Sequence, residues 1–149
     1  MRLRPARPED IPALARIAAA SYRQAFAGIL EPRALASRDA GFFVRRFRRV
    51  RRRLWLASER GRVIAFSLVT RKHLDMLFVD PRFAGRGAGR MLLSEGTRRG
   101  VRTLESFRDN HAARGFYERA GWRLARSYQR VFAGQLRNFV FYERLGRGG

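Results

Sequence analysis

A glycine-rich segment at residues 84–90 joins an apolar run, residues 74–79, to an amphipathic run that starts near Ala88. The segment contains three glycines and two arginines: Gly85, Arg86, Gly87, Gly89 and Arg90. Glycine permits a sharp turn and lets a ligand approach the backbone closely. The first amides of a helix have no partner within it and lie at the positive end of its dipole. Residues 84–90 therefore have the composition of a phosphate-binding loop at the start of a helix.

The loop by itself is compatible with more than one role. It could be a glycine-rich turn without a ligand, because short glycine motifs are weak indicators. A dinucleotide-binding loop would need the spacing Gly-x-Gly-x-x-Gly, whereas residues 85–89 have the spacing Gly-x-Gly-x-Gly. A Walker-type loop would need Gly-Lys followed by Ser or Thr, which this segment lacks.

A second segment, residues 104–122, places polar groups at helical spacing. Asn110 and Tyr117 are seven residues apart, which puts them two turns apart on roughly the same face of a helix. Simpler roles also fit these residues. Asp109 or Asn110 would cap the helix, and Tyr117 would be a core residue beside Phe116.

Both segments resemble motifs of the GNAT superfamily of N-acetyltransferases. The loop is similar to the acyl-CoA loop Gln/Arg-x-x-Gly-x-Gly/Ala, with Gly87 and Gly89 at the glycine positions and Ala84 where Gln or Arg is usual. The second segment is similar to Leu-Glu-Val-x-x-x-Asn-x-x-Ala-x-x-x-Tyr-Glu-x-x-Gly-Phe. Its matching positions are Glu105, Asn110, Ala113, Tyr117, Glu118 and Gly121, with Trp122 in place of Phe. Two motifs in the right order are more specific than either one alone.

The resemblance implies acetyl-CoA as co-substrate. The backbone at residues 77–79 would pair with the pantetheine arm as an added strand, and the Val79 amide would polarise the thioester carbonyl. Asn110 would hydrogen-bond the arm, and Tyr117 would protonate the leaving thiolate. The residues expected to bind acetyl-CoA are Leu77, Phe78, Val79, Gly85, Arg86, Gly87, Ala88, Gly89, Arg90, Asn110 and Tyr117. Because Ala84 replaces Gln or Arg, one side-chain contact to the pyrophosphate is missing.

The sequence leaves the general base open. Glu105 occupies the position at which the ribosomal-protein alanine acetyltransferase branch carries its base. Asp75 and His73 are two residues apart on a strand and are expected to share a face, and His73 stands where histone-type members have a glutamate base. A water relay would replace any of them. The candidate catalytic residues are thus Tyr117, Glu105, Asp75 and His73.

The elements that position these groups follow from periodicity and turn residues. We expect strands at residues 2–6, 54–58, 63–70, 74–79, 101–107, 122–132 and 137–144. We expect helices at residues 8–28, 32–52, 88–99 and 110–120. This order indicates an α/β fold on a mixed sheet. It is also the element order of the GNAT fold, which implies a mostly antiparallel sheet of about seven strands, splayed around a central parallel pair and flanked by four helices.

The length of 149 residues suits a single domain, residues 1–145, followed by a disordered tail at residues 146–149. No apolar run approaches the roughly 20 residues of a membrane span, and residues 1–4 do not resemble a secretory signal. Because the chain has no cysteine and two histidines, we expect no metal site. These features favour a cytoplasmic protein, either a monomer or a homodimer.

Positive charge dominates the composition, with 33 basic residues against 12 acidic ones and a formal net charge of +21. Codon bias in a GC-rich genome would account for Lys72 as the only lysine, and a polyanionic partner is a second candidate cause of the charge. The densest run of arginine lies at residues 45–53. Four apolar residues recur at helical spacing through this region: Phe43, Phe47, Val50 and Leu54. The pattern favours a solvated helix face over a nucleic-acid site, which would interleave exposed aromatics with charge.

The sequence does not identify the acceptor, which we expect to be a primary amine of a small molecule or a protein. In the GNAT fold the acceptor pocket is built by the first two helices and the last hairpin. Tyr22, Phe26 and residues 28–30 are therefore candidates, although core and loop packing would account for them too. Ala84 suggests the alternative function, a non-catalytic acyl-CoA-binding module or a nucleic-acid or protein-interaction module on the same scaffold.

Overall fold

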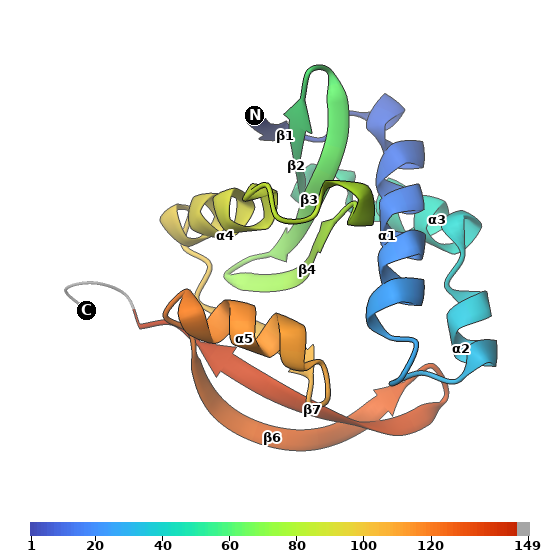
Figure 1. Cartoon of the computed structure of the whole chain (residues 1–149), viewed down its shortest axis with the longest axis vertical. Helices are drawn as coiled ribbons and strands as arrows, with labels where there is room; N and C mark the ends of the chain where they lie inside the picture. Colours follow the sequence, from blue (N-terminus) through green and yellow to red (C-terminus); the bar gives the residue numbers. More distant parts are fainter. Residues whose placement is uncertain (146–149) are drawn as a thin grey trace.

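The computed structural model describes residues 1–145, and seven strands of this part form one sheet in the order β1-β2-β3-β4-β5-β7-β6 (Figure 1). Neighbouring strands are antiparallel except β4 and β5, which are parallel. The strands are β1 (Arg2–Pro5), β2 (Leu54–Glu59), β3 (Arg62–Thr70), β4 (His73–Val79), β5 (Thr103–Phe107), β6 (Arg123–Phe132) and β7 (Gln135–Glu143). The predicted mixed, mostly antiparallel sheet is confirmed. The disorder predicted for residues 146–149 concerns positions outside the described residues.

Helices cover both faces of this sheet. In the described residues they are α1 (Ile11–Ala25), α2 (Pro32–Ser37), α3 (Ala40–Val50), α4 (Ala88–Arg98) and α5 (His111–Arg119). The buried side of α1 and α3 packs with Leu56 and Phe66 of the sheet, whereas α4 packs on Ala57 and Ile64. Adjacent strand residues point to opposite faces, so α1 and α3 cover one face and α4 covers the other (Figure 1). None of the described helices combines the length and the apolarity that a membrane crossing requires.

The prediction of a single helix at residues 32–52 is wrong, because two helices, α2 and α3, occupy this stretch. The break lies at Ser37–Asp39, where side chains take over hydrogen bonds of the backbone. Ser37 Oγ donates to the Ala34 carbonyl at 2.7 Å, and the Asp39 carboxylate accepts from the Phe42 N–H at 2.8 Å. Asp39 thus caps a new helix. Within residues 1–145, five α-helices flank the sheet rather than the predicted four.

Helix α3 confirms the amphipathic pattern of the arginine-rich region. Phe43 and Phe47 are fully buried against the sheet. The arginines at positions 45, 46, 48, 49, 52 and 53 are exposed. Burial of the two phenylalanine rings therefore explains why this helix forms despite its dense positive charge.

Tight turns set the register of two hairpins. Arg60 and Gly61 have φ angles of +53° and +76°, and Ala133 and Gly134 have +51° and +80°. Two consecutive residues with positive φ are typical of two-residue type I′ turns, whose twist matches that of the flanking strands. The second turn is shorter than predicted, so β7 begins at Gln135 instead of residue 137.

The parallel pairing of β4 with β5 is very short. It comprises His73 with Thr103 and Leu74 with Leu104. On its other side β4 has a bulge: Val69 pairs with Leu74 and the preceding β3 residue pairs with Met76, which leaves Asp75 as the extra residue. The two central strands stop pairing at this bulge, as the predicted splay requires.

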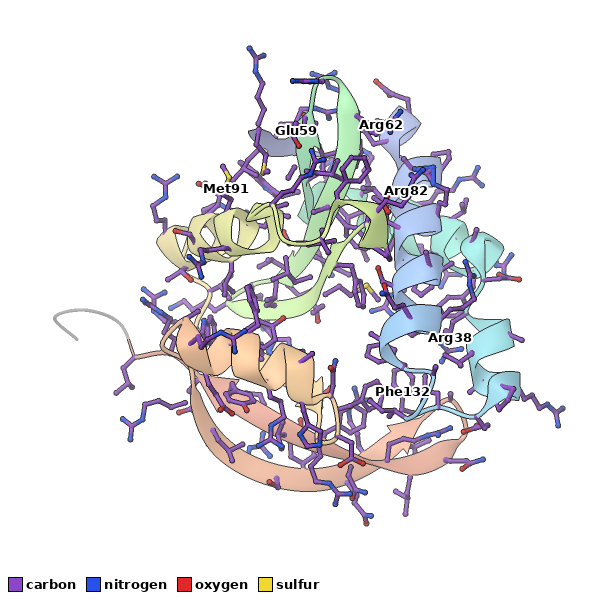
Figure 2. The ribbon with its side chains drawn as sticks, in the orientation of Figure 1. Arg38, Glu59, Arg62, Arg82, Met91 and Phe132 are labelled. Atoms are coloured by element: carbon purple, nitrogen blue, oxygen red, sulfur yellow. The ribbon has the colours of Figure 1, made fainter. Side chains whose placement is uncertain are left out.

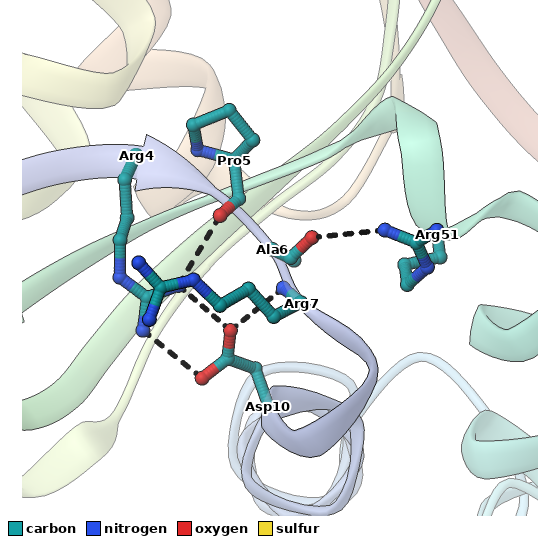
Figure 3. A network of polar contacts seen from close by, with 6 residues as sticks. All are labelled: Arg4, Pro5, Ala6, Arg7, Asp10 and Arg51. Atoms are coloured by element: carbon teal, nitrogen blue, oxygen red, sulfur yellow. Dashed lines mark hydrogen bonds and ion pairs between the residues drawn. The ribbon is translucent and has the colours of Figure 1, made fainter.

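A buried carboxylate joins the first strand to the first helix (Figure 3). The Arg4 guanidinium donates to the two Asp10 carboxylate oxygens at 2.8 and 3.0 Å, and the Arg7 N–H donates at 2.7 Å. Beside them, Arg51 donates to the Ala6 carbonyl at 3.5 Å. The Arg4 guanidinium holds the pKa of Asp10 below its usual value. The network therefore anchors β1 to the start of the helical layer.

We predict that Asp10→Asn lowers the free energy of unfolding by about 2 kcal/mol at pH 7, because charged hydrogen bonds are lost. The pKa of Asp10 is lower in the folded state, so its stabilisation is present above the unfolded pKa and is lost as the pH falls through the folded pKa. Urea denaturation at a series of pH values should show the difference from wild type shrink below about pH 4. Glu9→Gln, an exposed neighbour, is the control; an equal loss there would contradict the assignment.

Candidate active site

A cavity of about 870 Å³ lies between β4, β5 and α5 and extends to α1 and the β6–β7 hairpin. The predicted site residues that line it are Asp75, Leu77, Phe78, Val79, Gly85, Gly89, Glu105, Asn110 and Tyr117. The predicted residues outside its lining are His73, Arg86, Gly87, Ala88 and Arg90. The cavity thus brings together residues of both sequence motifs.

One wall of the cavity is an open backbone edge of β4. The Asp80 N–H donates to the Ile64 carbonyl of β3 at 2.7 Å. Because backbone groups alternate along an antiparallel strand, the amides of Leu77 and Val79 point away from β3. On that side the Val79 carbonyl accepts from Ser21 Oγ at 3.4 Å, and β5 does not pair with β4 here. An extended ligand can therefore add to this edge like a strand.

The loop after β4 is shaped by a buried carboxylate and by two glycines. Asp80 is 4% exposed, accepts from the Arg82 N–H at 3.0 Å and pairs with the Arg82 guanidinium at 2.9 Å. This arginine lowers the pKa of Asp80 and keeps it ionised. Gly85 and Gly87 have φ angles of +82° and +86°, in the left-handed region that favours glycine. The turn therefore directs the chain into α4 immediately after Gly87.

Helix α4 presents free amides to this loop. Its first backbone hydrogen bond runs from the Met91 N–H to the Gly87 carbonyl at 3.0 Å. The amides of Ala88, Gly89 and Arg90 precede that bond and have no backbone partner among the described residues. A Cβ at position 89 would lie 3.4 Å from Val79 Cγ2, so glycine permits the helix to start close against β4. The arrangement is an anion-binding helix terminus next to the open strand edge.

Two arginines of the loop and one of β3 form a surface cluster around Phe83. Arg86 pairs with Glu59 of the β2–β3 hairpin at 3.1 Å, and its guanidinium lies 5.2 Å from the Phe83 ring centre. Arg62 and Arg82 lie 5.8 Å from the same centre. Figure 2 shows Glu59 and Arg62 at the β2–β3 hairpin and Arg82 between that hairpin and α1. The charge of Arg86 is thus partly engaged by Glu59, outside the cavity lining.

Helix α5 supplies a tyrosine and an asparagine to the cavity. Tyr117 is buried, and its hydroxyl forms no hydrogen bond with a described residue; burial raises the pKa of this phenol. Asn110 caps α5 by accepting from the Ala113 N–H at 3.3 Å, as the capping interpretation predicted. Both residues nevertheless line the cavity. The Asn110 carboxamide nitrogen therefore stays available for a ligand while its oxygen caps the helix.

Glu105 is held by two neighbours on β6. Arg130 donates to both carboxylate oxygens, with Nε at 2.9 Å from Oε2, and the Tyr128 hydroxyl donates to Oε2. Burial alone would raise the pKa of Glu105, but the hydrogen bonds from Arg130 and Tyr128 outweigh it and the pKa lies below its usual value. Burial and the hydrogen bond to Glu105 raise the pKa of Tyr128 to about 12. A carboxylate whose oxygens already accept hydrogen bonds from Arg130 and Tyr128 is a weak proton acceptor.

The other two candidate bases differ in their surroundings. His73 Nδ1 lies 2.8 Å from Thr103 Oγ1, and the ring stacks 6.0 Å from the Phe141 ring centre, outside the cavity lining. Asp75 is exposed at the bulge and lines the cavity, and no hydrogen bond or ion pair with a described residue engages its carboxylate. The bulge also interrupts the strand alternation from which a shared face of His73 and Asp75 was expected.

Residues 51–124, which contain both motifs, match the family described as Acetyltransferase (GNAT) domain. The chain belongs to the GNAT superfamily. Peptidyl-lysine N-acetyltransferase YjaB of Escherichia coli (strain K12) is 33% identical over 73 residues, 48% of this chain and 50% of that protein. The chain thus spans about half the length of the curated relatives it matches.

Solved structures extend the likeness of fold to nearly the whole chain. The solution structure of apo-form YjaB from Escherichia coli has a TM-score of 0.82 at 24% identity, with 97% of each chain covered. The structure of yncA from Salmonella typhimurium with its cofactor acetyl-CoA has a TM-score of 0.69 at 18% identity, covering 99% of this chain and 96% of that one. The observed architecture is therefore the GNAT fold.

The resemblance implied that the last hairpin borders the acceptor pocket, but sequence reasoning named none of the β6 and β7 residues that face α1. Arg130, Phe132 and Phe139 line the cavity from this side, together with the predicted Tyr22 and Phe26. The residues of β6 on this face alternate between arginine and aromatic types: Arg126, Tyr128, Arg130 and Phe132. That period of two was the available signal. Their approach to α1 depends on the closure of the last hairpin.

One ion pair secures this closure. Arg137 of β7 is 9% exposed and donates from its two terminal nitrogens to both Glu31 carboxylate oxygens, at 2.7 and 2.8 Å. Its Nε donates to the Phe132 carbonyl at 3.0 Å. The Arg137 guanidinium lowers the pKa of Glu31 to about 2. The connection between α1 and α2 is thereby joined to the hairpin at the far end of the cavity.

We predict that Gly87→Ala lowers the free energy of unfolding by about 1 to 2 kcal/mol, because alanine is strained at a φ of +86°. Gly28→Ala is the matched control, since Gly28 has no positive φ and a methyl group added there would meet no atom within 4 Å. That control should stay within about 0.5 kcal/mol of wild type in urea denaturation. Equal stability of Gly87→Ala and wild type would show that the loop does not require glycine there.

Proposed function

We propose that the protein is an acetyl-CoA-dependent N-acetyltransferase that transfers an acetyl group to a primary amine. One arrangement carries the proposal. The open edge of β4 leads to the free amides of α4, and the Tyr117 hydroxyl, which has no partner among the described residues, lies in the same cavity. A phosphate-bearing extended ligand and a proton donor are thus accommodated together.

The groups in the donor half of the cavity would suit acetyl-CoA. The amides of Ala88, Gly89 and Arg90 would bind the pyrophosphate, and the Leu77 and Val79 backbone would pair with the pantetheine arm. The Asn110 carboxamide nitrogen would add a hydrogen bond to that arm. These backbone donors are independent of the side chain at position 84, so Ala84 is compatible with binding. Acetyl-CoA supplies the activated thioester.

Tyr117 would act as general acid. Its raised pKa keeps the phenol protonated at neutral pH, so it can donate a proton to the sulfur while the carbon–sulfur bond breaks. The Val79 amide would donate to the thioester oxygen, where negative charge develops. In balance, the acceptor nitrogen forms a bond to the acetyl carbon, the sulfur gains the tyrosine proton, and the acceptor loses a proton to a base or to water.

We propose Asp75 as the first candidate for that base, ahead of Glu105 and His73. The Asp75 carboxylate lines the cavity without a described partner, whereas Glu105 is held by Arg130 and Tyr128. Glu105 would instead fix the position of the β6 wall. A relay of waters between the acceptor and Asp75 would satisfy the same chemistry.

The proposed acceptor is a lysine side chain of a peptide or protein. Support comes from the name of the YjaB relatives, peptidyl-lysine N-acetyltransferase, over the matched half of their length. In addition, four aromatic residues line the far end of the cavity: Tyr22, Phe26, Phe132 and Phe139. Such rings can cover the aliphatic part of a lysine side chain.

We predict that wild type binds acetyl-CoA with micromolar or tighter affinity in calorimetry and that Tyr117→Phe retains this affinity. With a lysine peptide as acceptor, turnover of Tyr117→Phe should fall by about 100-fold, because the general acid is lost. Tyr142→Phe is the matched control, since Tyr142 is also buried but its hydroxyl bonds to Glu118 outside the cavity lining.

Three outcomes are distinguishable in this experiment. No binding of acetyl-CoA would remove the proposed function. Binding without acetylation of any amine in a broad panel would favour the alternative, a non-catalytic acyl-CoA-binding module. Unchanged turnover in Tyr117→Phe would leave the enzyme standing and exclude Tyr117 as the acid.

The choice of base gives a separate prediction. Asp75→Asn should lower kcat/KM by at least about 10-fold, because the acceptor amine loses its proton acceptor. The lowered pKa of Glu105 keeps it ionised above about pH 4.5, so Glu105→Gln should not move the acidic limb of the kcat/KM–pH profile. Loss of that limb in Glu105→Gln, with a normal limb in Asp75→Asn, would reverse the assignment.

A further inference from the structure

We propose that the far end of the cavity binds a carboxylate of the acceptor and that Arg38 selects lysines in acidic peptides. The inference rests on the proposed function and adds the substrate class. It concerns the region where the α2–α3 connection meets the β6–β7 hairpin, around Arg38, Tyr22 and Phe132. Its basis is the Arg38 guanidinium, which has no counter-ion among residues 1–145 and stacks on the cavity-lining Phe132, and the hydroxyl of the cavity-lining Tyr22, which no described residue engages. Arg38 itself lies outside the cavity lining.

The Arg38 guanidinium stacks on two aromatic rings. Its guanidinium carbon lies 4.4 Å from the Phe42 ring centre and 5.3 Å from the Phe132 ring centre. Figure 2 shows Arg38 and Phe132 near one another at this end of the molecule, and Phe132 lines the cavity. Stacking fixes the plane of the guanidinium while leaving its N–H edge free. Arg38 is thus preorganised to bind an anion.

No carboxylate among residues 1–145 pairs with Arg38. Its one hydrogen bond in this part of the chain is a long one, from Nη1 to Ser37 Oγ at 3.4 Å. The neighbouring arginines of the hairpin differ in this respect, because Arg130 is paired with Glu105 and Arg137 with Glu31. Arg38, like Arg46 of α3, therefore carries a positive charge at this end of the cavity that no described carboxylate pairs.

Tyr22 provides a second group that an anion would satisfy. It is 5% exposed and lines the cavity, and its hydroxyl donates to no described residue. Among residues 1–145, the buried side-chain polar atom without a hydrogen-bond partner is Ser67 Oγ. The Tyr22 hydroxyl, which also has no partner, is therefore not sealed from solvent, and it is accessible from the cavity. Burial raises the pKa of this phenol, and the charges of Arg46, Arg38 and Arg130 oppose that rise. The Tyr22 O–H is thus an unengaged donor in a region of positive charge, which favours a negatively charged acceptor.

A carboxylate suits this arrangement better than a positively charged partner. A guanidinium binds a carboxylate through two parallel hydrogen bonds, and Tyr22 would add a third donor. A polyamine or a basic peptide would be repelled by Arg38 and Arg46. The acceptor lysine would then enter toward Asp75 while a neighbouring Asp or Glu of the same peptide binds at Arg38.

The test compares matched peptides in which one lysine is flanked by aspartate, asparagine, arginine or phosphoserine. With saturating acetyl-CoA, wild type should favour the aspartate peptide over the asparagine peptide by about 10-fold in kcat/KM, mainly through KM. Arg38→Gln should bring this ratio near one. Arg38→Lys should retain part of the preference. Arg33→Gln, an exposed arginine of α2, is the matched control and should behave as wild type.

Calorimetry with acetyl-CoA and thermal unfolding of each variant separate this inference from the proposed function. Absence of acetyl-CoA binding in wild type removes the function itself. Equal use of aspartate and asparagine peptides by wild type overturns the anion site and leaves the function intact. A preference that persists in a folded Arg38→Gln overturns the role of Arg38, and a preference for phosphoserine alone overturns the carboxylate as its ligand.

Discussion

The short parallel pairing of β4 with β5 is the constraint on which the site depends. The two strands share two residue pairs, and the bulge at Asp75 then ends their contact. Every backbone group left unpaired inside a protein needs a partner. The amides of Leu77 and Val79 therefore form a binding edge rather than part of a ladder. Longer pairing would close the sheet and fill the cavity with β5.

Arginine has two different roles in this chain. Arg4, Arg82, Arg130 and Arg137 each pair with a carboxylate that is at least partly buried, and each pair joins elements or shapes a loop. The arginines on the outer face of α3 are exposed instead. A high net charge is thus compatible with a compact fold, because several of the acidic residues sit where an arginine can reach them. The composition by itself does not separate these two groups of arginines.

The two carboxylates of the cavity illustrate how surroundings assign roles. Glu105 and Asp75 both line it, but Glu105 accepts hydrogen bonds from Arg130 and Tyr128 and has a lowered pKa. Asp75 has neither partner, because the bulge turns it out of the ladder. A group whose charge is already neutralised binds a proton weakly, so position in the family motif does not suffice to identify a base.

Local sequence patterns predicted the glycine loop, the order of elements, the mixed sheet and the two motifs on β4–α4 and β5–α5, because glycine spacing and apolar periodicity are local properties. They also predicted the apolar face of α3. The break in the long second helix was found in the structure alone, although the Asp39 cap on the Phe42 amide is a local contact. Only the tertiary structure decided the partners of Glu105 and the isolation of Arg38. The partners of Glu105, Tyr128 and Arg130, lie 23 and 25 positions away along the chain. The isolation of Arg38 depends on which carboxylates the fold leaves free, so no local pattern records either feature.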